Sequence, residues 1–392
     1  MPLPHLRMTR MMPMTKRSVL DRTVLSLFSG AGGLDLGFER VGFRHLTAVE
    51  IAPWCVATLR RNRPKWNVII GDVRQYEPTL DEKVDVLLAG FPCQGFSLGG
   101  NRDASDSRNT LYKEVVRLSR SLRPRVIVIE NVLNLRTMCI PGTNRPFAEQ
   151  IVHELTQAGY TVLYDFFRVS EYGVPQTRRR FVFLAFRGVP PNRFHFPEPG
   201  EVTSIRESLY DLAQGKVIDL PNHQPHWGFA SQVHVETGER FKHTEEVVPV
   251  RFSRTASDGN PIRDFDSPFP AIDTATVWGW AQGNVSARRV EKDRTREKYI
   301  RNPDADVTLW RVSASRLRSF THREYARLQT FPDDWVFEGS NKRDVQLQIG
   351  NAVPVRFAEV IARTVWRSLD ALDRDEPFNA GRRSLRAQLL LL

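Results

Sequence analysis

Residues 24–39 read VLSLFSGAGGLDLGFE, and this stretch decides the fold class. An apolar run at 24–27 leads into a glycine-rich turn, and a helical pattern follows. Glycines let the backbone approach a ligand closely, and the N-terminus of the next helix offers N–H groups to a negative group such as a carboxylate. Because a lone glycine-rich turn is a weak signal, its meaning depends on the strands that come next.

Acidic residues end the next two predicted strands. The run 46–49 leads to Glu50, about 20 residues after Gly30, a spacing that suits a carboxylate binding ribose hydroxyls. The run 67–71 leads to Asp72, where a carboxylate can bind an adenine amino group. A glycine turn, a Glu and an Asp are therefore predicted at one edge of an open α/β sheet, where such sheets bind ligands.

Residues 90–97, GFPCQGFS, follow the apolar run 84–89. Cys93 is thus expected just beyond a strand end, with Pro92 fixing the backbone before it and Gly95 letting the loop bend. This pattern favours a nucleophile on a loop that closes over a substrate. A buried structural cysteine, the commoner fate of a free thiol, is the alternative.

The alternation of strands and helices continues to residue 186. We expect helices at 110–122 and 147–157, and strands at 126–129, 161–169 and 181–186. Glu130 and Asn131 end the first of these strands, so Glu130 is a candidate acid or hydrogen-bonding group near Cys93. A surface acid after a strand is the alternative.

Residues 176–180, QTRRR, lie between the last two predicted strands. Alternate residues of an extended segment point the same way, so Arg178 and Arg180 share a face with Gln176, and Arg179 lies opposite. Adjacent arginines are more often a solvated patch. Their position between two core-like runs favours a directed role.

From 188 to 317 the regular alternation stops, and Pro, His, Trp and charged residues recur without periodicity. His223 and His226 have a metal-compatible spacing, but no Cys or acid completes a set nearby, so no metal site is expected. Order returns at 318–334, where Thr321 and Glu324 form a capping box and Pro332 is expected to stop the helix. Residues 348–354 then lead into an apolar, Arg-bearing helix to about residue 369.

Composition describes an ordinary soluble protein of 392 residues, with 41% hydrophobic and 26% charged residues. Three cysteines without a C-x-x-C pair argue against a disulfide framework and for a reducing, cytosolic setting. No run is long enough to span a membrane, and residues 1–22 lack a signal-peptide core. The net charge of +11 and pI near 9.8 favour a polyanionic partner, although a generally basic surface is the alternative.

These blocks, in this order, resemble the DNA cytosine-5 methyltransferase family. The resemblance covers 24–186 and 318–358, and the motifs that carry it are FSGAGG, GFPCQGFS, ENV, QTRRR, ARLQTFPD and QIGNAVP. It implies a Rossmann-like sheet that uses S-adenosylmethionine, yields S-adenosylhomocysteine and needs no metal. It also implies that 188–317 is a smaller, irregular target-recognition domain inserted before the segment that completes the catalytic domain.

The resemblance also assigns roles to individual residues. Cys93 would attack carbon 6 of a flipped-out cytosine, Glu130 would bind N3 with Asn131 as its structural partner, Arg180 would hold O2, and Arg178 would orient the cysteine loop or the base. Gln94 would close behind the extruded base. Ser97 and Gln176 would serve the loop and the DNA.

For the cofactor, the resemblance implies a set of residues along the sheet edge. These are Phe28, Gly30 and Gly32 for the methionine end, Glu50 for the ribose, Ile51, Asp72 and Val73 for the adenine, and Pro92 and Asn351 near the sulfonium. Ile51 stands where many relatives carry an aromatic that stacks on adenine, so this chain departs from the family pattern at the adenine.

The expected organisation is a basic tail at 1–22, a catalytic domain at 23–187, the target-recognition domain at 188–317, a C-terminal segment at 318–375 and a tail at 376–392. The expected enzyme is a monomer in a prokaryotic cytoplasm, associated with the nucleoid. It would act on double-stranded DNA and protect it from a restriction endonuclease without a stable complex. A tRNA cytosine-5 methyltransferase and an inactive DNA-binding homologue are the alternatives.

Overall fold

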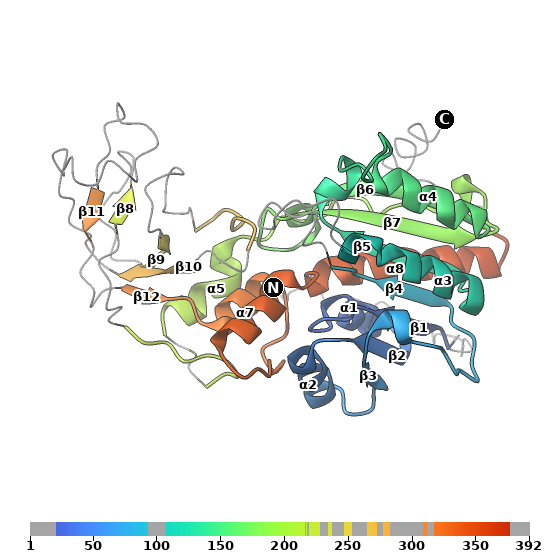
Figure 1. Cartoon of the computed structure of the whole chain (residues 1–392). Helices are drawn as coiled ribbons and strands as arrows, with labels where there is room; N and C mark the ends of the chain where they lie inside the picture. The colour runs from blue at the N-terminus through green and yellow to red at the C-terminus, as the bar shows by residue number, and fades with distance from the viewer. Residues whose placement is uncertain are drawn as a thin grey trace, which may run out of the picture.

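The computed structural model describes residues 21–92, 107–215, 217, 219–227, 234–236, 247–252, 265–272, 277–282, 309–311 and 317–376. Within them lies a seven-stranded sheet with the strand order β3-β2-β1-β4-β5-β7-β6 (Figure 1). Its strands are β1 Thr23–Leu27, β2 Arg44–Glu50, β3 Val68–Ile70, β4 Val86–Ala89, β5 Val126–Asn131, β6 Tyr160–Arg168 and β7 Arg179–Arg187.

The first five strands of this order run parallel, and β7 runs antiparallel to both of its neighbours. The central strands β1, β4 and β5 are buried along their whole length. This burial explains why they appear in the sequence as continuous apolar runs without alternation. The mixed α/β class predicted from the strand and helix pattern is confirmed.

Helices cover both faces of the sheet. They are α1 Gly33–Val41, α2 Pro53–Asn62 and α8 Val355–Asp373 on one face, and α3 Tyr112–Leu122 and α4 Phe147–Gln157 on the other. Helices α1 and α8 lie so close that a Cβ at Gly37 would stand 2.4 Å from the Cβ of Ala358. The last long helix therefore packs directly on the helix that follows the glycine turn.

The region predicted to recognise the target holds helix α5 Ile205–Ala213, which lies near the middle of the molecule, and short strands at the end far from the large sheet (Figure 1). The strands are β8 His234–Glu236, β9 Val247–Phe252, β10 Val277–Gln282, β11 Leu309–Arg311 and β12 Leu317–Ser319. Strands β12, β10 and β9 form one sheet, and β11 pairs with β8. The predicted domain boundary after residue 317 falls inside β12.

Two further helices, α6 His322–Leu328 and α7 Lys342–Asn351, return the chain to the large sheet. The predicted capping box of Thr321 and Glu324 is confirmed at the start of α6. The expectation that Pro332 stops this helix is wrong, because α6 already ends at Leu328 and Thr330 takes a left-handed φ of 58°. Helix α7 was not predicted.

None of the helices in the described part of the chain combines the length and the apolarity needed to cross a membrane.

Candidate active site

The polar residues predicted at strand ends meet at one edge of the sheet. Strands β2, β4 and β5 run in the same direction as β1, so Glu50, Pro92 and Glu130 follow at their carboxyl ends. Asp72 follows β3 at the same edge. The sheet topology thus brings together the residues that the sequence placed in separate motifs.

Glu50 is 8% exposed and is held by two backbone N–H groups. Gly30 donates to Oε2 at 2.7 Å, and Ala52 donates to Oε1 at 2.8 Å. A carboxylate oxygen can accept more than one hydrogen bond, so both oxygens keep capacity for a ligand hydroxyl. The carboxylate is therefore fixed in position beside the glycine turn.

The glycine turn leaves room on the side where a ligand would lie. Gly30 has a φ of 55°, and a Cβ built on it would meet nothing within 4 Å. Gly32, by contrast, is packed, because a Cβ there would lie 2.6 Å from Leu59. Phe28, at the end of β1, also has a positive φ of 56° and is partly buried.

Asp72 is engaged by its neighbour Arg74. The Arg74 backbone donates to Oδ1 at 3.0 Å, and its guanidinium lies 2.5 Å from Oδ2. These hydrogen bonds hold the pKa of Asp72 below its usual value, so the carboxylate stays an acceptor. A hollow of about 410 Å³ extends from Asp72 along β3 and is lined by Ile70 and Tyr76 among others.

The other residues predicted for the adenine differ in exposure. Val73 is buried, whereas the Ile51 side chain is 61% exposed. Asn351, at the end of α7, is exposed. The backbone just after it presses on the glycine turn, since a Cβ at Gly33 would stand 2.1 Å from the carbonyl oxygen of Val353.

These observations fit S-adenosylmethionine as the ligand. An open glycine turn, a fixed carboxylate with spare acceptor capacity and an ionised Asp at the next strand end match the three parts of a nucleoside-bearing donor. The assignment of single residues to those parts stays a prediction.

Glu130 and Arg180 form the polar centre of the edge. Nε of Arg180 lies 2.5 Å from Oε1 of Glu130, and the two side chains are 12% and 10% exposed. Burial raises the pKa of Glu130 above its usual value, while the charge of Arg180 opposes this rise. A Cβ at Gly90 would lie 4.0 Å from Oε2 of Glu130, so that oxygen faces the segment leading to Cys93.

Asn131 ties the end of β5 to that same segment. Its Nδ2 donates to the carbonyl oxygen of Phe91 at 3.1 Å, and its Oδ1 accepts from the backbone N–H of Val132 at 2.8 Å. Pro92 follows Phe91, and Cys93 is the next residue along the chain. Cys93, Gln94 and Ser97 lie outside the described residues, so their positions stay predictions.

The predicted alternation in 176–180 is confirmed. Gln176 and Arg178 are 0% and 3% exposed, and Arg180 is partly buried, whereas Arg179 is exposed. Nη1 of Arg178 donates to the carbonyl oxygens of Gly350, at 2.7 Å, and Ile272, at 3.2 Å. Arg178 thus links the sheet edge to α7 and to 265–272, and the role predicted for it at the cysteine loop stays a prediction.

Gln329 joins the segment before β7 to α7 through buried hydrogen bonds, although the sequence gives little sign of this role. It accepts from Nε2 of Gln176 at 2.8 Å and donates to the carbonyl oxygen of Ile349 at 2.7 Å. Gln176 also donates to the carbonyl oxygen of Leu328. The only sequence signal was its place in the ARLQTFPD motif, between the end of a helix and Pro332.

A buried acid and a buried histidine lie behind the glycine turn, and the sequence did not indicate either. Asp35 is 0% exposed, and its Oδ1 lies 3.8 Å from Nδ1 of His45. Burial raises the pKa of Asp35 to about 7 and lowers the pKa of His45 to about 4. The pair is therefore mostly uncharged between these two values.

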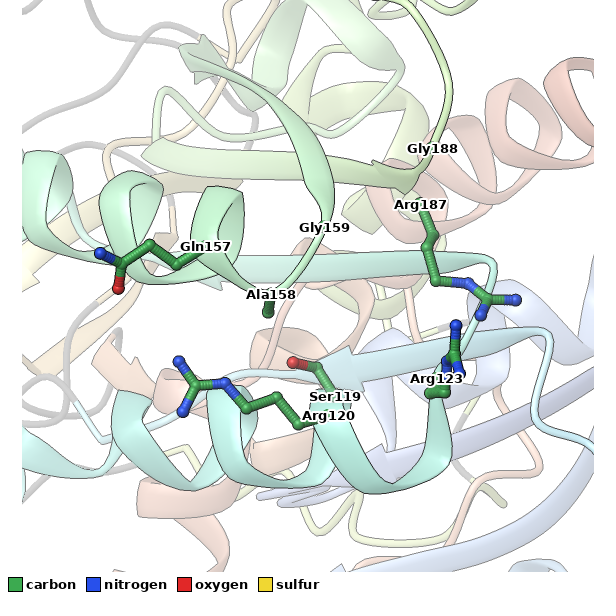
Figure 2. Close-up of a pocket in the computed structure, with 8 residues that line it drawn as sticks. All are labelled: Ser119, Arg120, Arg123, Gln157, Ala158, Gly159, Arg187 and Gly188. Carbon is green, nitrogen blue, oxygen red and sulfur yellow. The ribbon is translucent and has the colours of Figure 1, made fainter.

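The opposite end of the sheet carries a second hollow of about 620 Å³, shown in Figure 2. Arg120, Arg123 and Arg187 line it together with Gln157. Arg187 ends β7, which runs antiparallel to β5, so this hollow lies away from Glu130. No group of His, Cys, Asp or Glu suited to a metal occurs among the residues that the structure describes.

Comparisons with known proteins agree with this geometry. The profile of the family described as C-5 cytosine-specific DNA methylase matches residues 22–367. Type II methyltransferase M.Eco47II of Escherichia coli is 33% identical over 92% of this chain and 82% of its own length. Type II methyltransferase M.PspPI of Psychrobacter sp. is 32% identical over 90% of this chain and 81% of its own length.

Solved structures share the fold. A putative DNA modification methyltransferase encoded within an E. coli prophage has a TM-score of 0.58 at 22% identity, covering 89% of this chain and all of its own. The Dnmt2 methyltransferase of S. pombe has a TM-score of 0.53 at 18% identity, covering 90% of this chain and 99% of its own. The family match spans most of the sequence and includes every strand of the large sheet. The chain therefore belongs to the C-5 cytosine-specific DNA methylase family, which transfers a methyl group from S-adenosylmethionine to carbon 5 of cytosine.

Proposed function

We propose that this chain methylates one cytosine within a specific double-stranded DNA sequence, with Cys93 as the nucleophile and the Glu130–Arg180 pair as the group that binds the base. The observation that carries the proposal is the buried 2.5 Å ion pair at the end of β5, beside the segment that leads to Cys93. Carbon 5 of cytosine is a poor nucleophile. An enzyme that methylates carbon 5 must therefore first activate the ring.

Cys93 performs this activation in the proposed mechanism. Its thiolate forms a bond to carbon 6, and the ring electrons move toward N3, where Glu130 supplies a proton or a hydrogen bond. Carbon 5 then has enamine character and can attack an electrophile. S-adenosylmethionine supplies the methyl group when it is bound.

The ring is restored by elimination. A water-relayed base removes the proton from carbon 5, the bond between sulfur and carbon 6 breaks, and Cys93 leaves as thiolate. Any proton that N3 received returns to Glu130, so the carboxyl group is restored. Arg180 holds O2 of the cytosine and stabilises negative charge on the ring, and Arg178 positions the segments around it. Burial of Glu130 supports its role, because a raised pKa lets a carboxyl group keep a proton at higher pH.

The cytosine must leave the stack for this chemistry, because carbon 6 cannot be reached by a protein thiol within a duplex. We propose that Gln94 and the glycine-containing loop around it close behind the extruded base, with Ser97 on the same loop. Gln176, whose buried side chain joins the β6–β7 connection to Gln329, supports the base-binding side.

The cofactor residues follow the resemblance in this proposal. Glu50 binds the ribose, since its carboxylate is already fixed by two N–H groups. The remaining assignments are the methionine end at Phe28, Gly30 and Gly32, the adenine at Ile51, Asp72 and Val73, and the sulfonium neighbourhood at Pro92 and Asn351. No metal takes part.

The biological role proposed is protection of DNA from a restriction endonuclease that reads the same sequence. The relatives named above are Type II methyltransferases, which supports this role. We further propose a monomer in a prokaryotic cytoplasm, in contact with the nucleoid, that forms no stable complex with the endonuclease. The segment 188–317 would read the sequence.

Methyl incorporation tests the substrate class. Purified protein and labelled S-adenosylmethionine should transfer label to duplex DNA and not to tRNA; label in tRNA alone would support the tRNA methyltransferase alternative. Label in neither would support the inactive DNA-binding homologue. Bisulfite sequencing of DNA from cells that carry the gene should show one protected cytosine in one short sequence.

A further inference from the structure

The three arginines of 176–180 are not all used by the proposed chemistry. Arg178 and Arg180 point to the face that holds Glu130 and Gly350, whereas Arg179 is exposed on the other face. Successive residues of a strand project to opposite faces. Arg179 is therefore next to Arg180 in the sequence, but its side chain points away from the Glu130–Arg180 pair.

A second arginine stands directly opposite Arg179. In the β6–β7 ladder Arg168 pairs with Arg179, next to the pair of Phe167 and Arg180. Like charges placed directly opposite across two strands destabilise a sheet. Among the residues that the structure describes, Arg168 pairs with Glu171, at 3.9 Å, and Arg179 has no ion pair.

Arg136 adds a third positive charge to the same face. It ends η3 Leu133–Arg136, the short helix after β5. Burial and the nearby charge of Glu149 raise the pKa of Tyr164 of β6, and the charge of Arg136 acts in the opposite direction, so Arg136 lies near this tyrosine. Tyr164 shares its face of β6 with Arg168, since the two are four positions apart and side chains alternate along a strand. Arg136 is exposed and has no ion pair in the described part of the chain.

We propose that Arg136, Arg168 and Arg179, the β6–β7 basic patch, bind the phosphate backbone of duplex DNA beside the extruded cytosine. This inference rests on the proposed function, because it takes the base bound at Glu130 as the point from which the DNA strand continues. A strand whose base reaches Glu130 crosses the same sheet edge. Phosphates supply the negative charge that offsets the repulsion between the facing arginines.

The repulsion itself distinguishes this patch from a structural cluster. If the arginines stabilised the fold, their removal would lower the melting temperature. If they bind phosphates, neutralising Arg168 or Arg179 should weaken DNA binding. The melting temperature of the free protein should then stay unchanged or rise.

The test measures the affinity of the full-length protein for a non-cognate DNA duplex between about 50 and 200 mM salt. The double variant Arg168→Gln, Arg179→Gln should bind at least about 10-fold more weakly at about 100 mM salt. The slope of log affinity against log salt is negative, and its magnitude should fall by about 2. Arg136→Gln, which is outside the strand pair, should reduce the magnitude of this slope by about 1.

A matched control removes the same charge from the opposite end of the sheet. Arg120→Gln with Arg187→Gln changes two arginines of the hollow in Figure 2 and should keep the wild-type affinity and slope. Equal losses of DNA affinity in the two double variants would mean that only the net charge of the protein matters, and would overturn the proposal. So would a wild-type slope in both patch variants.

The outcome is separable from the proposed function. Binding to a non-cognate duplex is measured without methyl transfer. A wild-type protein without methyltransferase activity would therefore refute the proposed function, and the salt slopes would still test whether the basic patch binds phosphates. In an active protein the patch variant should raise KM for DNA with little change in kcat, and an unchanged KM would contradict the patch alone.

Discussion

Nε of Arg180 lies 2.5 Å from Oε1 of Glu130, although the two residues are 50 positions apart in the sequence. They meet because β7 runs antiparallel beside β5 and pairs Val182 with Glu130. Burial raises the pKa of Glu130, and the Arg180 charge acts in the opposite direction. The proton affinity of the proposed acid is thus set by two opposing effects within one contact.

Replacing Arg180 by Gln should therefore raise the pKa of Glu130 further. If the reaction needs the protonated carboxyl group, activity falls as pH rises through that pKa, and the variant should move this fall to higher pH. Its maximal rate should also drop, because the contact to the base is lost. Single-turnover methyl transfer across pH measures both effects, with Glu130→Gln expected to lose about 100-fold or more. A fall displaced to lower pH would contradict the assignment.

Two glycines of the turn should respond differently to alanine. Gly33→Ala places a Cβ 2.1 Å from the Val353 carbonyl oxygen, so it should lower the free energy of unfolding by about 3 kcal/mol or more. Gly30→Ala meets no protein atom within 4 Å, so only its left-handed backbone should cost about 1–2 kcal/mol. We expect Gly30→Ala to weaken S-adenosylmethionine binding at least about 10-fold, as a loss of about 1.4 kcal/mol would. Denaturant unfolding and calorimetry measure the two quantities, and wild-type cofactor binding by Gly30→Ala would exclude the turn as the binding site.

Gln329→Leu should loosen the joint between the sheet edge and α7. The change leaves the carbonyl oxygen of Ile349 without this donor and removes one of the two acceptors of the Gln176 amide, so buried hydrogen bonds are lost. The free energy of unfolding should fall by about 2–3 kcal/mol. The exposed Gln157 is the control, and its change to Leu should stay within about 0.5 kcal/mol. Equal effects in denaturant unfolding would mean that the buried contacts of Gln329 contribute little.

Asp35 and His45 should produce opposite pH dependences of stability. Asp35, with its pKa raised to about 7, binds a proton in the folded state that the unfolded chain has released, so its contribution falls as pH rises from about 4 to 7. His45, with its pKa lowered to about 4, stays neutral where the unfolded chain is protonated, so its contribution rises between about pH 4 and 6.5.

Single substitutions should therefore separate the two effects. Relative to wild type, Asp35→Asn should add a slope of about +1.4 kcal/mol per pH unit, and His45→Gln a slope of about −1.4 kcal/mol per pH unit. Urea unfolding at several pH values measures the difference curves. Slopes of the same sign in both variants would refute the opposing pair.

The sequence predicted what depends on local pattern. The strand ends at Glu50 and Glu130 and the helix Phe147–Gln157 follow from apolar runs and periodicity, and the structure confirms them. Helix α7 was missed because its apolar positions are few, although Asn341 caps it by accepting hydrogen bonds from Arg343 and Asp344.

Contacts between distant segments could not be predicted in the same way. Nothing local in 176–180 indicates that Arg178 reaches Gly350, because that contact depends on how α7 packs against the sheet. The end of α6 likewise depends on tertiary contacts, since the Gln329 side chain is bound by Gln176 and Ile349 well before Pro332. The predicted domain boundary after residue 317 falls within β12, and the pairing of this strand with β10 is also a contact between distant segments.

The central claim is that the thiol of Cys93 adds to the cytosine while the Glu130–Arg180 pair binds it. The most direct test compares wild type with Cys93→Ser for methyl incorporation into duplex DNA from labelled S-adenosylmethionine, with DNA affinity measured in parallel. Wild type should form 5-methylcytosine at one cytosine of one short sequence, and Cys93→Ser should form none while still binding the duplex. Methylation by Cys93→Ser at the wild-type rate would contradict the central claim.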